Sequence, residues 1–127
     1  MHWVVDGMNL IGSTPDGWWR DRAAARRRLV RALAGFAAGE EDAEVTVVFD
    51  GRPTPGEAEE ARAGGIDARF APGGPNAADH AIEALLGPLC DRGAVTVVSS
   101  DAALVSAVRR AGAAVEGVRA FRDRLAR

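Results

Sequence analysis

The sequence predicts an α/β fold, a three-layer sandwich in which helices cover both faces of a mostly parallel sheet of about five strands. Two observations support this class. Five short runs of β-branched and apolar residues alternate with segments of helical periodicity. Successive residues within these runs are apolar, so both faces of the predicted strands are buried, as is typical of parallel sheets.

The strands are predicted where these short apolar runs occur. In the first of them, Trp3, Val4 and Val5 lead directly to an aspartate, Asp6. The five strands are expected at His2–Asp6, Glu44–Phe49, Ile66–Phe70, Ala94–Ser99 and Ala113–Gly117.

Helices are predicted where apolar residues recur at three- and four-residue spacing. In the first helix, Leu29, Leu33 and Phe36 form such a stripe. Gly112 follows the third helix and suits a helix C-terminus. The helices are expected at about Arg22–Ala38, Ala78–Leu89, Asp101–Ala111 and Phe121–Leu125.

Length and composition indicate one globular domain over residues 1–127. With 47% hydrophobic and 27% charged residues, the chain has the composition of a packed domain rather than a disordered segment. The formal net charge of -2 excludes an overall basic field, so any binding of nucleic acid depends on local charge. All 16 basic residues are arginine, which excludes P-loop, receiver-domain and Schiff-base chemistry that needs a lysine.

The few cysteine and histidine residues exclude two further kinds of site. Cys90 is the single cysteine, so no intramolecular disulfide forms, and His2 and His80 are too few to complete a structural zinc site. The N-terminus resembles no targeting peptide, and no apolar stretch is long enough to cross a membrane. We therefore expect a cytoplasmic protein without a membrane partner.

Aspartates occupy the predicted strand ends. Asp6, Asp50 and Asp101 follow the first, second and fourth strands, and Asp79 begins the helix that leads into the fourth. Because the carboxyl ends of parallel strands meet at one edge of a sheet, the four carboxylates are expected to converge there, provided the third strand is also parallel. Their mutual repulsion calls for a divalent cation.

Oxygen ligands favour Mg²⁺ or Mn²⁺ over zinc, and such an ion supports hydrolysis of a phosphodiester by a bound water. Asn9, Ser99 and Ser100 lie beside the acidic positions and are candidates to bind a ligand water or a substrate phosphate. The hypothesis is a metal-dependent nuclease whose catalytic and metal-binding residues are Asp6, Asp50, Asp79 and Asp101.

Each aspartate also has a structural interpretation. Asp6 and Asp50 each precede a glycine, a common turn pair, and Asp79 lies three residues after Asn76, where it suits a helix N-terminus. Asp101 follows a serine that could cap the next helix. None of these interpretations explains why all four share one edge.

A short aromatic and basic segment follows the first strand. Trp18, Trp19, Arg20 and Arg22 combine flat rings with guanidinium groups, a mixture that stacks bases and holds phosphates of single-stranded nucleic acid. The alternative is that one or both tryptophans pack against the domain.

The acidic motifs resemble those of NYN domains in the PIN-like nuclease superfamily, in particular the bacterial YacP-like branch. The matching segments, in order, are Val4–Gly12, Val47–Gly51, Ala78–Glu83 and Val97–Asp101. The resemblance implies a Rossmann-like PIN fold, endoribonuclease activity, and an acidic site for Mg²⁺ or Mn²⁺. By position it implies metal binding by Asp6, Asp79 and Asp101, with Asp50 as a further acid and Asn9 as a polar partner.

RNA is the partner that the resemblance implies, with the ribosome and its mRNA as partners in some members of the branch. The rival hypothesis is a noncatalytic RNA-binding or ribosome-associated adaptor. A toxin-type PIN nuclease and a homodimer both stay open. A phosphatase of haloacid dehalogenase type is disfavoured, because Met8 stands where that family needs a second aspartate.

Overall fold

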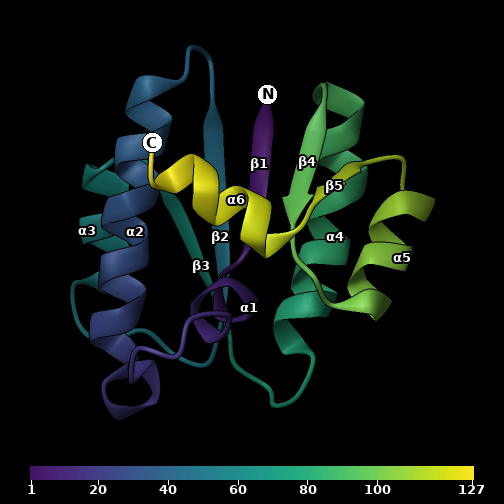
Figure 1. The fold of residues 1–127 in the computed structure, drawn as a ribbon. Coiled ribbons are helices and arrows are strands. Elements are labelled where there is room, and N and C mark those ends of the chain that lie inside the picture. The colour runs from purple at the N-terminus through teal and green to yellow at the C-terminus, as the bar shows by residue number, and fades with distance from the viewer.

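The computed structural model describes all 127 residues and contains one five-stranded sheet. Every pair of neighbouring strands is parallel, and their spatial order is β3-β2-β1-β4-β5. The first strand is therefore the central one (Figure 1). The strands are β1 (His2–Asp6), β2 (Glu44–Asp50), β3 (Asp67–Ala71), β4 (Val95–Val98) and β5 (Ala114–Glu116).

Helices cover both faces of this sheet. One apolar cluster joins α1, α2, α3 and α6 to one face, and a second joins α4 and α5 to the other (Figure 1). The helices are α1 (Gly7–Gly12), the 3-10 helix η1 (Trp18–Arg20), α2 (Arg22–Gly39), α3 (Glu57–Ala63), α4 (Ala77–Arg92), α5 (Ala102–Arg110) and α6 (Val118–Leu125). The predicted α/β class and three-layer arrangement are confirmed.

The predicted elements are all present, with bounds that differ by a few residues. The third strand runs parallel to its neighbour, as convergence of the aspartates requires. The last helix starts at Val118, three residues before its predicted start at Phe121. Three helices were not predicted, α1, η1 and α3, because three to seven residues are too few for apolar periodicity to become visible.

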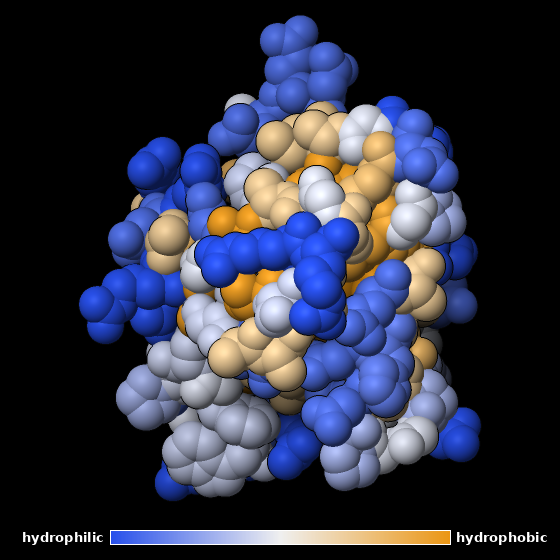
Figure 2. Space-filling view, turned by 90° about the vertical axis from the view of Figure 1, so that its right-hand side faces the viewer, coloured by the Kyte–Doolittle hydropathy of each residue, from blue (hydrophilic) through white to orange (hydrophobic).

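On the side of the molecule where α5 lies, apolar residues are exposed between hydrophilic ones (Figure 2). The strand β5 has only one neighbour, β4, so it forms one edge of the sheet. No helix combines the length and the hydrophobicity that crossing a membrane requires.

Gly7 allows the first helix to pack closely against the neighbouring strand. A Cβ atom at this position would lie 2.4 Å from Cδ1 of Phe49 and 3.0 Å from the carbonyl oxygen of Val48. The Phe49 ring is completely buried and has no room to move. The glycine after Asp6 is thus required by packing, and it lets the chain turn from β1 into α1 beside β2.

We expect Gly7→Ala to lower the free energy of unfolding by about 1–3 kcal/mol, because the added methyl group overpacks the core. The matched control is Gly35→Ala, in the interior of α2, where a Cβ atom meets nothing within 4 Å. That change should stabilise the protein by about 0.5–1 kcal/mol through helix propensity. Urea unfolding measures both, and equal effects of the two variants would contradict the close-packing role of Gly7.

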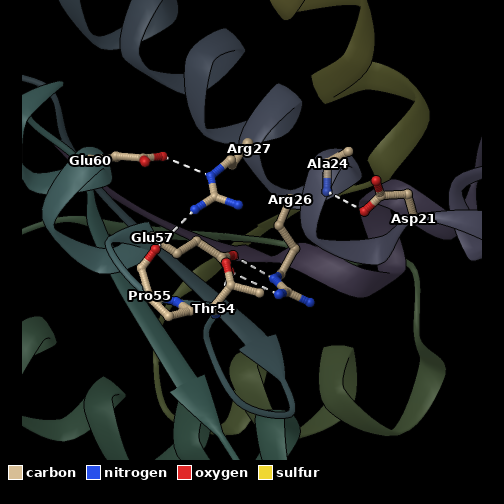
Figure 3. Close-up of polar contacts among 8 residues, drawn as sticks. All are labelled: Asp21, Ala24, Arg26, Arg27, Thr54, Pro55, Glu57 and Glu60. Carbon is tan, nitrogen blue, oxygen red and sulfur yellow. Dashed lines mark hydrogen bonds and ion pairs between the residues drawn. The ribbon is translucent and has the colours of Figure 1, made fainter.

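A buried ion pair connects α2 to α3 (Figure 3). Arg26 and Glu57 are only 6% and 3% exposed, and two parallel hydrogen bonds join the guanidinium to the carboxylate. The amide and the hydroxyl of Thr54 both donate to the same carboxylate, each at 2.9 Å. Burial raises the pKa of Glu57, but these hydrogen bonds outweigh it and lower the pKa to about 2. The pair thereby fixes the loop that follows Asp50.

Replacing the buried acid by Glu57→Gln should destabilise the protein by about 3 kcal/mol, because Arg26 then stays buried without a counter-charge. The control is Glu60→Gln, which removes the exposed ion pair between Arg27 and Glu60 (Figure 3) and should cost less than about 1 kcal/mol. Both values come from urea unfolding at pH 7. A loss below about 1 kcal/mol for the buried pair would show that it does not hold the two helices.

Candidate active site

The four aspartates lie at the carboxyl edge of the sheet. Asp6 and Asp50 are the last residues of β1 and β2, and Asp101 is the N-cap of α5, shortly after β4. Asp79 lies in the first turn of α4, which follows β3. The parallel direction of all five strands brings these positions to the same edge.

Asp6 is the most buried of the four, with 4% of the residue exposed. Burial raises its pKa to about 6, and the negative charges of Asp79 and Asp50 add to this rise. The hydroxyl of Ser99 donates a hydrogen bond of 2.8 Å to Oδ2 and offsets part of it. The other carboxylate oxygen accepts no hydrogen bond from a side chain. Near neutral pH this carboxylate is therefore charged at an energetic cost.

Two other aspartates cap helices with one carboxylate oxygen each. Oδ1 of Asp50 accepts a hydrogen bond of 3.2 Å from the amide of Ala78, at the start of α4. Oδ1 of Asp101 accepts one of 3.0 Å from the amide of Leu104, in the first turn of α5. The N-cap of α5 is therefore Asp101 itself rather than the preceding serine. In both residues Oδ2 accepts no hydrogen bond within the protein.

Asp79 makes neither a hydrogen bond nor an ion pair, although it is half-buried. Its pKa is raised by burial and by the neighbouring charges of Asp101, Asp50 and Glu83. The structural interpretation of Asp79 is confirmed in its position, since Asp79 lies in the first turn of α4, where the helix dipole favours an acid. Its side chain makes no cap bond, and the carboxylate that accepts from the start of α4 is that of Asp50. Asp79 is thus a carboxylate without a structural partner.

The neighbouring polar residues hold the acidic edge together. The side-chain oxygen of Asn9 accepts from the amide of Ser100 at 2.8 Å. The hydroxyl of Ser99 donates to Asp6 and accepts from the amide of Asp101 at 3.1 Å. The hydroxyl of Ser100 accepts from the amide of Val118 at 3.0 Å. The hydroxyl of Ser99 therefore both donates and accepts within the protein, whereas that of Ser100 only accepts and keeps its proton available to a ligand.

Two further residues take part in this edge, and only Val118 was not identified from the sequence. Val118, at the start of α6, fixes Ser100 from 18 residues away, and no local pattern signals such a contact. Glu83 is one helical turn after Asp79, and this spacing makes it a second-rank candidate ligand from the sequence, behind a solvated or ion-paired glutamate. In the structure Glu83 is exposed, forms no ion pair, and raises the pKa of Asp79. His80 is exposed.

The four carboxylates suit a hard divalent cation in donor type and in charge. No three His, Cys, Asp or Glu side chains form a complete metal-ligand group by themselves. A magnesium site does not require one, since this ion keeps several waters and binds through one or two carboxylates. The available ligands are Oδ2 of Asp50 and of Asp101, both oxygens of Asp79, and the Asp6 carboxylate, whose charged form Ser99 and the backbone amide of Asn9 favour.

The aromatic segment lies at the lower end of α2 in Figure 1, on the side of the carboxyl edge. Trp18 packs partly against the core, while Trp19 is 53% exposed. The guanidinium of Arg22 lies 5.3 Å from the ring centre of Trp18, and that of Arg20 lies 5.8 Å from Trp19. No hydrogen bond or ion pair joins this segment to the four aspartates. Of the two rings, only Trp19 is largely free to stack on a ligand.

Comparison with known proteins decides the family. The sequence profile of the YacP-like NYN domain matches residues 3–127, which is nearly the whole chain. The chain belongs to the YacP-like NYN family. NYN domains are in general nucleases, so the chain has a nuclease-type fold.

Solved structures agree with this assignment. The structure of Rae1 (YacP) from Bacillus subtilis superposes with a TM-score of 0.79 at 23% identity, covering 98% of this chain and 73% of that one. Its W164L mutant gives a TM-score of 0.75 at 24% identity, with 98% and 74% covered. No curated protein matches the sequence. These structural likenesses establish the fold of the NYN domain.

The raised pKa of Asp6 predicts an unusual pH dependence of stability. The unfolded chain releases this proton at lower pH than the folded chain, so the contribution of Asp6 to stability is most favourable below about pH 4 and falls as pH rises to about 6. Asp6→Asn cannot ionise and should be more stable than the wild type by about 3 kcal/mol at pH 8, and nearly equal at pH 4.

Urea unfolding in EDTA at the two pH values measures this difference. The control is Asp123→Asn, an exposed aspartate of α6, which should change little between pH 4 and pH 8. A stability difference of Asp6→Asn that is the same at both pH values would rule out the charged carboxylate as its cause.

Proposed function

We propose that this NYN domain is a metal-dependent endoribonuclease that hydrolyses RNA phosphodiester bonds at the acidic edge of its sheet. The observation that carries the proposal is the convergence of Asp6, Asp50, Asp79 and Asp101 at one edge. The charges of Asp79 and Asp50 raise the pKa of Asp6, and those of Asp101 and Asp50 raise the pKa of Asp79. A fold gains no stability from like charges placed together. Their presence together at the edge of a nuclease-type domain therefore favours a site that binds a cation.

The four aspartates would hold Mg²⁺ or Mn²⁺ between them, one or two directly and the others through waters of the ion. The ion supplies charge stabilisation at the phosphodiester and a water of lowered pKa for attack. Asp79 contributes a carboxylate that no protein group occupies. Asp50 and Asp101 are held in place because each also caps a helix.

Substrate positioning is assigned to the segment after α1. Trp19 offers an exposed ring for base stacking, and Arg20 and Arg22 offer guanidinium groups for phosphates. Trp18 holds this segment in place through its contact with the core. The amide nitrogen of Asn9 is free to donate, because its oxygen is the atom bonded to Ser100.

The test is cleavage of a labelled mixed-sequence RNA with Mn²⁺, Mg²⁺ or EDTA. Asp79→Asn is the most informative variant, because this side chain makes no bond that the fold needs. We expect at least about a 100-fold loss of cleavage rate, equivalent to about 2.7 kcal/mol of transition-state stabilisation. Asp123→Asn is the matched control and should cleave like the wild type.

Cleavage that persists in EDTA, or in Asp79→Asn at the wild-type rate, would contradict the proposal. RNA binding without cleavage in a correctly folded wild type would instead support the noncatalytic RNA-binding or ribosome-associated adaptor. A reaction with purified ribosomes present then distinguishes a ribosome-dependent nuclease from that adaptor.

A further inference from the structure

A hollow of about 200 Å³ lies between α1, α2 and α6. Its lining includes the apolar side chains of Leu10, Ile11 and Leu29, which also belong to the core. Two arginines, Arg28 and Arg122, complete the lining from α2 and α6. An apolar floor with guanidinium groups beside it differs from the purely acidic site at the sheet edge.

The charge of these two arginines is not neutralised by a paired carboxylate. Their neighbours in α2, Arg26 and Arg27, form ion pairs with acids of α3. Arg28 is exposed and makes no hydrogen bond or ion pair. Asp16 is the one carboxylate that lines the hollow, so its two guanidinium groups leave an excess of positive charge. The hollow therefore attracts an anion.

Neutral groups hold the second arginine in position. Arg122 donates to the carbonyl oxygen of Ser13 at 3.1 Å and to the hydroxyl of Thr14 at 2.7 Å. These bonds fix its side chain while leaving its charge intact. A guanidinium that is already ordered loses less conformational entropy when it binds a ligand.

The hollow adjoins the acidic site through two helices. In α1, Asn9 contacts Ser100 at the acidic edge, while the next two residues line the hollow. In α6, Val118 contacts the same serine, and Arg122 follows one turn later. Since α1 has six residues, it is about 9 Å long. One nucleic-acid strand that lies on this surface can therefore contact both the hollow and the acidic edge.

We propose that this hollow binds one base and a phosphate of the single-stranded RNA whose backbone is cleaved at the acidic edge, an inference that rests on the proposed function. Its volume is below the roughly 300–1,000 Å³ of pockets for drug-sized ligands, which suits a single base. The apolar floor accepts the base, and Arg28 and Arg122 bind phosphate oxygens.

The first experiment measures RNA binding without cleavage. Fluorescence anisotropy with a labelled mixed-sequence single strand in EDTA compares Arg28→Gln with Arg31→Gln. Arg31 is the matched control, because it lies on the same helix but lines the hollow between α2 and α3. Arg122 is not substituted, because its hydrogen bonds hold the loop after α1 in position.

We expect Arg28→Gln to weaken RNA binding about 5- to 10-fold, because one phosphate contact is lost. Arg31→Gln should change RNA binding less than about 2-fold. Losing one such contact should also reduce the slope of log K against log salt by about 0.7. Equal effects of the two variants on affinity and slope would overturn the subsite.

A second experiment locates the base. RNA that contains 4-thiouridine should crosslink under light to peptides of α1 and the following loop, or to α6. Crosslinks confined to α3 or α5 would overturn the proposal. A competition experiment with poly-glutamate tests the other polyanion. If poly-glutamate displaces RNA from the wild type, and Arg28→Gln weakens its binding as much as it weakens RNA binding, the hollow binds an acidic protein segment and the proposal is overturned.

Cleavage with Mn²⁺ separates this proposal from the proposed function. If both hold, Arg28→Gln raises KM and leaves kcat unchanged. If the wild type cleaves RNA and Arg28→Gln binds it like the control, the subsite is wrong and the nuclease stands. If nothing cleaves but Arg28→Gln binds RNA more weakly, the nuclease fails and the subsite stands.

Discussion

The buried carboxylate of Asp6 at the end of the central strand is the constraint on which the rest of the site depends. β1 lies between β2 and β4, so its last residue is enclosed by neighbouring strand ends. Burial and the nearby charges of Asp79 and Asp50 both oppose ionisation there. Ser99 donates one hydrogen bond, which compensates only in part. A cation bound at this edge would favour the charged form of Asp6 against both effects.

Two of the four aspartates also cap helices that belong to the site. Asp50 caps α4, on which Asp79 lies, and Asp101 caps α5. Substituting either residue therefore affects helix stability as well as the charge of the site. Asp79 has no such bond, so the chemistry of the site and the stability of the fold separate most cleanly at this position.

Local charge, and not the net charge of -2, determines how this surface would interact with the RNA of the proposed function. Arg26 and Arg27 are neutralised by acids of α3 and contribute to the structure of that face. Arg28 on the same helix and Arg122 on α6 have no paired carboxylate and lie beside α1. Unpaired positive charge and the acidic edge thus lie on either side of one short helix. This arrangement suits a polyanion whose reacting phosphate lies near the acids.

The sequence by itself determined the α/β class and the edge at which the aspartates gather. Strands that are apolar on both faces require cover on both sides, and parallel strands bring residues such as Asp6 and Asp101 to one end. Apolar periodicity also located the long helices, but it could not reveal α1 or α3, which are shorter than two full repeats.

Only the tertiary structure decided which polar group meets which. It assigned the cap of α4 to Asp50, turned the hydroxyl of Ser99 inward, and left Trp19 more exposed than Trp18. It also brought Arg122 to Ser13, a residue 109 positions away. Periodicity reports which face of an element is buried, whereas these pairings depend on the packing of elements that are distant in the chain.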